Sequence, residues 1–216
     1  MRAGVPDVPR APRIYVLAGT NGAGKSSIAG AMLLKRRVEY FNPDEAARRI
    51  LAANPGITQT QANSAAWHEG KRLLERAIAE RLDFAFETTL GGRTITDLLG
   101  RAASDGFEVR IWYVGLSSPE LHVARVRARV AKGGHDIPEP RIRERYDASR
   151  LNLIRLLPRL GELWVYDNSE DADADAGVAP EPRLVLHVRR GAIVGPRDLR
   201  LTPEWAKAIV AAAMKA

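Results

Sequence analysis

The stretch Arg13–Ser27, RIYVLAGTNGAGKSS, constrains the fold more than any other part of the sequence. It opens with the short apolar run Ile14–Ala18, which is typical of a strand buried in a parallel sheet. The next residues, GTNGAGKS, match the pattern G-x-x-x-x-G-K-[ST] of a phosphate-binding loop. From Ser27 onward, apolar residues recur at helical spacing. A glycine-rich turn that binds nothing is the alternative, but the flanking strand and helix favour a phosphate loop.

Backbone amides are the groups that such a loop offers to a phosphate. Glycines let the chain curl so that successive N–H groups point inward, and the following helix adds the positive end of its dipole. Lys25 would reach the β- and γ-phosphates of a nucleotide, and the Ser26 hydroxyl would bind Mg²⁺. The residues predicted to hold ATP are Asn21, Gly22, Ala23, Gly24, Lys25, Ser26 and Ser27.

The length of 216 residues is enough for one domain with a substantial core. We expect residues 1–12 to form a loosely ordered tail and residues 13–216 to form a single domain. The sequence contains neither a signal-peptide core nor an apolar run of membrane-spanning length, which fits a cytoplasmic protein with no membrane partner. It also has no cysteine, which excludes disulfides, a thiol nucleophile and cysteine-bound zinc.

The formal net charge of +7 raises the question of a polyanionic partner. Arginine supplies most of the positive charge, and its guanidinium matches phosphate oxygens. The alternative is that these arginines are a solvated surface. Because no aromatic platform for RNA and no DNA-reading motif is present, nucleic acid is not the partner we expect.

Apolar patterns along the rest of the chain alternate between strand and helix periods. Strands are expected at residues 14–18, 38–41, 84–86, 107–114, 162–166 and 183–188, and helices from residue 27 and at residues 45–53, 58–82, 94–103, 119–131, 138–157 and 203–214. This order predicts a three-layer α/β/α sandwich with a mainly parallel sheet. The acidic run at residues 171–177 is expected to be a surface loop. Ligands in such folds bind at the carboxyl ends of the strands, so residues 42–45 and 87–89 should join the phosphate loop in one cleft.

Two carboxylates stand at these strand ends. Asp44 could accept a proton from a hydroxyl that attacks the γ-phosphate, or it could cap the following helix, a role that Asn42 could also fill. Glu87 could hold a substrate hydroxyl or Mg²⁺-bound water, or could merely solvate the strand end. Thr88, Thr89 and Arg93 follow Glu87 on a turn and could add hydrogen bonds to a substrate, although turns also favour threonine for local reasons.

Residues 119–150 have the character of a helical lid. Arg125 and Arg129 share one face of the helix 119–131, and two like charges there favour a facing anion. The alternative is a solvated helix face. The glycine pair at 133–134 and His135 could form a hinge, with His135 either a local polar residue or a phosphate contact. Arg141, Arg145 and Tyr146 begin the next helix and could complete the lid, whereas His68, His122 and His187 are isolated and expected to be structural.

Four segments taken together resemble the zeta-toxin family of P-loop kinases: GTNGAGKSS, FNPDEAARRI, FAFETTLGGRT, and RVRARVAKGGHDIPEPRIRERYDASRLNL. Their order and spacing hold from about Ile14 to Asn168. The phosphate loop alone is generic, but the combination of NPDE, ETTL and GGHDIP is far more specific. The resemblance implies ATP- and Mg²⁺-dependent phosphorylation of a small molecule. In the best-known branch, the acceptor is the sugar 3′-hydroxyl of UDP-N-acetylglucosamine, so that or a related nucleotide-sugar is the candidate acceptor.

The resemblance also implies roles for individual residues. Asp44 matches the family's proposed base, Glu87 a substrate-binding glutamate, and Lys25 and Ser26 the phosphate-loop positions. Arg129, with Arg125 close behind, is the candidate for the first of two lid arginines. At the position of the second, this chain has the segment near His135, and Arg145 could substitute. A second substrate-binding acid of the family falls near Lys71. The resemblance further makes an antitoxin protein a candidate partner.

Two other functions remain open at this point. The positive charge is compatible with a polynucleotide 5′-hydroxyl kinase, whose binding to RNA or DNA would depend steeply on salt. A phosphate loop is also compatible with a non-catalytic ATP-binding interaction protein. A GTPase is disfavoured because no N-K-x-D motif for base recognition is present.

Overall fold

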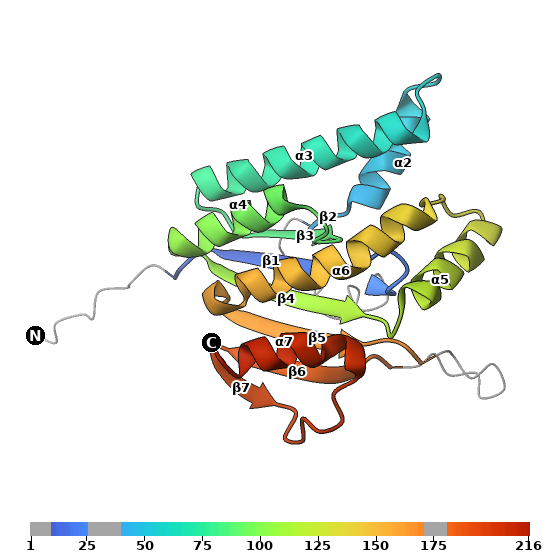
Figure 1. Cartoon of the computed structure of the whole chain (residues 1–216). Coiled ribbons are helices and arrows are strands. Elements are labelled where there is room, and N and C mark those ends of the chain that lie inside the picture. Colours follow the sequence, from blue (N-terminus) through green and yellow to red (C-terminus); the bar gives the residue numbers. More distant parts are fainter. Residues whose placement is uncertain (1–9, 26–39, 171–180) are drawn as a thin grey trace, which may run out of the picture.

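The structure, a computed structural model, describes residues 10–25, 40–170 and 181–216. Within these ranges, seven strands form one sheet in the order β2-β3-β1-β4-β5-β6-β7 (Figure 1). The strands are β1 (Arg13–Ala18), β2 (Tyr40–Phe41), β3 (Phe84–Thr88), β4 (Glu108–Gly115), β5 (Glu162–Asp167), β6 (Arg183–Arg189) and β7 (Ala192–Gly195). The first five in spatial order run parallel, and β6 and β7 are antiparallel. The predicted α/β fold with a mainly parallel sheet is confirmed.

Helices flank the sheet. They are α2 (Pro43–Ala53), α3 (Gln59–Ala79), α4 (Arg93–Ser104), α5 (Pro119–Ala131), α6 (Glu139–Leu156) and α7 (Lys207–Ala213), with short 3₁₀ turns at Leu157–Arg159 and Glu204–Ala206. Helices α3, α4, α6 and α7 cover one face of the sheet (Figure 1). The helix expected from Ser27, most of the tail 1–12, the start of the strand 38–41 and the acidic run 171–177 lie outside the described residues.

Strand β1 lies inside the sheet, between β3 and β4, and its side chains alternate between two apolar clusters. Ile14, Val16 and Ala18 belong to the main core beneath the helices. Tyr15 and Leu17 belong to a second cluster on the opposite face. Because both faces of this strand are covered, it has the continuous apolar sequence of a buried parallel strand. The phosphate loop begins directly at its carboxyl end.

The start of α2 shows which of the two candidate residues, Asn42 or Asp44, caps this helix. The Asn42 side chain accepts hydrogen bonds from the backbone N–H groups of Asp44, at 2.9 Å, and Glu45, at 3.2 Å. Asn42 is therefore the cap, and α2 begins at Pro43, two residues earlier than predicted. The Asp44 carboxylate does not cap the helix, which leaves it for other contacts.

The carboxyl-terminal part of the sheet differs from the prediction. Strand β7 was not expected, and it pairs with β6 through a two-residue connection, Arg190 and Gly191. Both residues have positive φ, 48° and 77°, as a tight antiparallel hairpin requires. The predicted helix at 203–214 is shorter than expected, because its first turn is the 3₁₀ segment and α7 begins only at Lys207.

Helix α5 and the first turns of α6 form a separate arm beside the sheet (Figure 1). Their apolar contacts form a small cluster of Val123, Val126 and Ile142 rather than part of the main core. We call residues 119–146 the arm. No helix in the described ranges is long and apolar enough to cross a membrane.

Candidate active site

The phosphate loop is packed tightly against its neighbours, and two of its glycines have no room for a side chain. Gly22 and Gly24 have φ of 84° and 82°. A Cβ atom on Gly22 would lie 2.7 Å from the carbonyl oxygen of His122 on α5, and one on Gly24 would lie 2.3 Å from Nδ2 of Asn168. The same Asn168 amide donates a hydrogen bond to the carbonyl of Ala23 at 2.9 Å. The loop shape is therefore set by β5 and α5 as well as by its own sequence.

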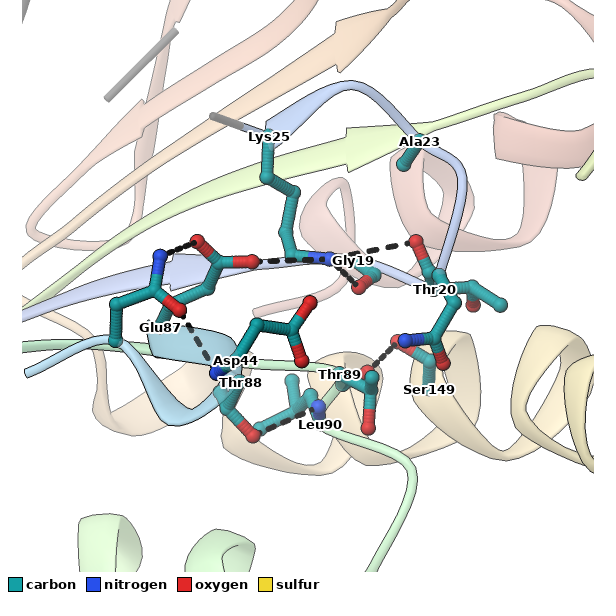
Figure 2. Close-up of polar contacts among 12 residues, drawn as sticks. Gly19, Thr20, Ala23, Lys25, Asp44, Glu87, Thr88, Thr89, Leu90 and Ser149 are labelled. Carbon is teal, nitrogen blue, oxygen red and sulfur yellow. Dashed lines mark hydrogen bonds and ion pairs between the residues drawn. The ribbon is translucent and has the colours of Figure 1, made fainter. Parts of the chain in front are cut away.

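Lys25 is buried and folds back over the loop (Figure 2). Its ammonium donates to the carbonyl of Gly19 at 2.8 Å and to that of Thr20 at 3.4 Å. It also forms an ion pair with Glu87 Oε1 at 3.5 Å, where the two side chains are 7% and 10% exposed. The charge of Lys25 is thus balanced by the strand-end carboxylate that the sequence placed in the same cleft.

Both oxygens of the Glu87 carboxylate are engaged. Oε1 faces Lys25, while Oε2 accepts from the Tyr40 hydroxyl at 3.1 Å and from the Asn42 side-chain amide at 3.4 Å. Burial, followed by the nearby charge of Glu87, raises the pKa of Tyr40, so this hydroxyl remains a donor. Sequence reasoning missed Tyr40, whose position at the end of a short strand beside β3 was the available signal.

Asp44 faces the arm. Its Oδ2 lies 3.8 Å from Nη1 of Arg129, and the two side chains are 40% and 38% exposed. Arg129 also donates to the carbonyl of His135 at 3.2 Å, and its buried Nε has no hydrogen-bond partner among the described residues. In Figure 2, the Asp44 carboxylate extends from the start of α2 into the space near Lys25. A carboxylate and an arginine therefore face each other across the mouth of the site.

A cavity of about 500 Å³ opens beside these groups. Its walls come from the start of α2, the middle of α3, the loop after β3 and the beginning of α6. The predicted site residues that line it are Asn21, Asp44, Glu87, Thr88, His135 and Arg145. The structure thus brings one phosphate-loop residue, both predicted carboxylates and two residues of the arm to one cavity.

The loop after β3, residues 89–92, is held by side chains of α6, of which Figure 2 shows Ser149. Ser149 donates to the carbonyl of Thr89 at 2.7 Å, and the Asn152 amide donates to the carbonyl of Leu90 at 2.9 Å. Leu90 is fully buried with φ of 53°, and its N–H donates to the Thr88 hydroxyl at 3.0 Å. Thr88 therefore supports the loop as well as lining the cavity. Sequence reasoning missed Ser149, which lies within the stretch 119–150 expected to be a lid, and Asn152, which follows that stretch on the same helix.

Arg145 is partly buried, whereas an arginine on a solvated lid would be exposed. Its Nη1 donates to the Asn21 side chain of the phosphate loop at 2.8 Å. Burial lowers the pKa of Arg145, and the neighbouring charge of Arg141 adds to this effect. Arg145 therefore connects the beginning of α6 to the phosphate loop.

Some predicted site residues lie elsewhere. Arg93 is exposed at the start of α4 and is not among the residues that line the cavity. Arg125 donates to the backbone carbonyl of Glu170 at 3.0 Å and, with Arg129 and Lys132, borders a separate shallow hollow. Ser26 and Ser27 lie outside the described residues. In the described ranges, no group of three or more His, Asp or Glu side chains could hold a metal ion.

His122 is buried in a structural position, as its isolation in the sequence suggested. Its Nδ1 is 2.8 Å from the carbonyl oxygen of Asn21, and its ring meets Tyr146 edge to face. Burial lowers its pKa to about 4. A neutral ring whose Nδ1–H donates to Asn21 fits this environment, so His122 fastens α5 to the phosphate loop.

The fold and this site define a phosphate-loop protein of the α/β class. The zeta toxin family matches residues 3–172, and the chain belongs to this family. An uncharacterized protein of Haemophilus influenzae is 33% identical over 128 residues, which are 59% of this chain and 88% of the relative.

Two solved structures are similar in fold. The AvrRxo1-ORF1:-ORF2 complex with ATP aligns with a TM-score of 0.66 and 18% identity over 94% of this chain, which spans 63% of the length of that one. A structure of the PezAT chromosomal toxin-antitoxin system of Streptococcus pneumoniae aligns with a TM-score of 0.52 and 15% identity, covering 74% of this chain and 69% of that one.

Proposed function

We propose that the chain is an ATP-dependent phosphotransferase that transfers the γ-phosphate to a hydroxyl group of a small molecule. The observation that carries the proposal is that two carboxylates line one cavity and each is paired with a cation: Glu87 with Lys25 at 3.5 Å, and Asp44 with Arg129 at 3.8 Å. Membership of the zeta toxin family and the likeness to a complex that holds ATP support it.

The reaction assigns one task to each of these groups. The acceptor hydroxyl gives its proton to the Asp44 carboxylate while its oxygen forms a bond to the γ-phosphorus. The bond from that phosphorus to the bridging oxygen of ADP breaks, and ADP leaves with the electron pair. Lys25 would leave Glu87 for the phosphates, and Arg129 would leave Asp44 for the transferred group, so that both cations stabilise the developing charge. The ion pairs keep Lys25 and Arg129 beside the two carboxylates of the cavity, which supports these roles.

Mg²⁺ is the cofactor expected to accompany ATP. Asp44 and Glu87 both line the cavity, so carboxylate oxygens of the kind that Mg²⁺ takes are present beside the phosphate loop and fit the ion, directly or through bound water. When bound, Mg²⁺ neutralises phosphate charge and orients the phosphates. Ser26, the expected direct ligand, lies outside the described residues.

The identity of the acceptor is a separate part of the proposal. UDP-N-acetylglucosamine, at its sugar 3′-hydroxyl, or a related nucleotide-sugar is the first candidate. A polynucleotide 5′-hydroxyl is the second, favoured by the net charge of +7. An antitoxin protein is a candidate partner because the PezAT system is a toxin-antitoxin system. We also propose a cytoplasmic location, where ATP is available.

Transfer from labelled ATP to a panel of nucleotide-sugars, sugars and oligonucleotides tests the function. Asp44→Asn should lower turnover by about 10²–10⁴-fold while ATP still binds, because it removes the proton acceptor. Glu45→Gln is the matched control, since Glu45 is the exposed neighbour of Asp44 and does not line the cavity. Lys25→Ala should abolish transfer. Wild-type turnover in Asp44→Asn would overturn its role as the base, and tight ATP binding without transfer to any acceptor would favour a non-catalytic protein.

A further inference from the structure

The wall of the cavity formed by α3 has no role in the phosphoryl transfer described above. Asn63, Ser64, Trp67 and Lys71 all line the cavity from this helix. Residues three and four positions apart share one face of a helix, so these side chains form a single surface. Trp67 is 43% exposed, which is unusual for so large an apolar side chain, and its exposed ring borders the cavity.

A close helix contact holds this surface in place. A Cβ atom on Gly70 would lie 2.5 Å from the ring of Phe41, so α3 approaches the end of β2 as closely as a glycine allows. Gly70 lies between Trp67 and Lys71 on the helix. The backbone that carries Trp67 and Lys71 is therefore held close to the end of β2, and Asp44 follows shortly after that end in the chain.

Lys71 adds a positive charge to this wall of the cavity, and its ammonium group can bind a ligand. Its ammonium pairs with Glu75 at 2.6 Å, and the two side chains are 31% and 44% exposed. Such exposed pairs within one helix are weak, so an anion in the cavity can compete for the ammonium. Of the described phosphate-loop residues, only Asn21 lines the cavity. Lys71 therefore belongs to the acceptor side of the cavity rather than to the cradle of the ATP phosphates.

We propose that Trp67 and Lys71 form an acceptor subsite for a compound that carries a ring and an anionic group. The ring stacks on the indole of Trp67, and a phosphate or carboxylate group binds Lys71. Sugar phosphates and nucleotides share this chemistry. The inference rests on the proposed function, because it names the class of molecule whose hydroxyl reaches Asp44.

Matched acceptors that differ only in charge test the role of Lys71. Glucose is compared with glucose 6-phosphate, and uridine with uridine 5′-monophosphate, by transfer from labelled ATP and by calorimetric binding with a non-hydrolysable ATP analogue present. The wild-type chain should bind the anionic member of at least one pair about tenfold or more tightly. Lys71→Met should raise its KM by a similar factor with little change in kcat, and Lys71→Glu should raise it further.

Arg76→Met is the control for the loss of a cation. Arg76 lies on the same helix and pairs with Glu80 four residues on, as Lys71 pairs with Glu75, but it does not line the cavity. It should leave the charge preference unchanged. For the ring contact, Trp67→Ala should weaken binding of the anionic acceptor, and Trp67→Phe should restore most of it. A preference for uridine 5′-monophosphate alone would identify a nucleobase as the stacked ring, and a preference for glucose 6-phosphate alone a sugar.

The failures of the two proposals are distinguishable. Equal binding of charged and neutral members in both pairs, or no binding of either anionic member, overturns the subsite, as does a Lys71→Met effect no larger than that of Arg76→Met. None of these results bears on transfer to another acceptor. Conversely, binding that depends on the charge of the acceptor and is weakened by Lys71→Met upholds the subsite, even where no acceptor is phosphorylated. The lack of phosphorylation would overturn only the proposed function.

Discussion

The two halves of helix α6 are held in different ways. The carboxyl-terminal half buries Ser149, Asn152 and Leu153, and its polar side chains bind the loop after β3. The amino-terminal half packs on α5 through the small cluster around Ile142. Its outer surface carries exposed ion pairs, among them Arg143 with Glu120 at 2.6 Å. We call the phosphate loop, β3 and the loop after β3 the floor of the site. Helix α6 therefore joins this floor to an arm with few buried apolar contacts.

This difference separates the site residues into two groups. Lys25, Glu87 and Thr88 stand on elements packed into the sheet, and their contacts are preset. Arg129 and His135 stand on the arm, where fewer apolar contacts resist movement. We expect loss of a buried apolar side chain in the floor to change stability, and loss of the half-exposed Arg129 of the arm to change activity with the fold intact.

Apart from the Lys25 and Asp44 variants above, the largest expected effect is on catalysis and concerns the arm. Arg129→Ala should lower kcat by about 10³-fold, because an arginine on the transferred phosphate stabilises the charge of the transition state. The melting temperature should change little, since the Arg129 side chain is 38% exposed. Arg127→Ala is the control, because Arg127 lies on the same helix, is 73% exposed and pairs with Glu139. Equal kcat values for the two variants would contradict a catalytic role for the arm.

The next effect is on stability and concerns the floor. Leu90→Ala should lower the free energy of unfolding by about 2–5 kcal/mol, because it removes a fully buried side chain and leaves a cavity. Leu151→Ala, on the outer side of α6 where Leu151 is 55% exposed, should cost far less. Chemical denaturation measures both. If Leu90→Ala were as stable as Leu151→Ala, the loop after β3 would not be fixed.

Acid should weaken the contact between the arm and the phosphate loop. The pKa of His122 is lowered from 6.5 to about 4. Between these two pH values, the His122 ring is therefore protonated in the unfolded chain but neutral in the folded chain. The contribution of neutral His122 to the free energy of unfolding is present above pH 6.5 and is lost as the pH falls towards 4. The loss amounts to roughly 3 kcal/mol in all. His122→Asn keeps a side-chain N–H donor but does not titrate, so its unfolding free energy should depend less on pH. Parallel curves for the two proteins would contradict a buried neutral His122.

The smallest effect concerns the outer surface of the arm. Arg143→Ala breaks exposed pairs with Glu120 and Glu139, where the Arg143 side chain is 43% exposed. Because exposed pairs are screened by solvent, the melting temperature should move by no more than about 1–2 °C, and less at high salt. A larger shift in a thermal melt would mean that these pairs hold the arm as firmly as buried contacts hold the floor.

The sequence predicted those parts of the fold that local patterns encode. The apolar run before the phosphate loop predicted β1, and the structure has that strand at Arg13–Ala18. The pairing of β6 with β7 was missed, because the positive φ values of Arg190 and Gly191 carry only a weak sequence signal. Asp44 and Glu87 were predicted to share a cleft, and they line one cavity.

By itself, the sequence determined the phosphate loop, the order of strands and helices, and the carboxylates at two strand ends, because each depends on residues near one another in the chain. Only the tertiary structure decided which of Asn42 and Asp44 caps α2, that Tyr40 holds Glu87, and that Ser149 supports the loop after β3. The last two contacts join residues 47 and 60 positions apart. Their partners are selected by how the strands and helices pack, and no local pattern records that selection.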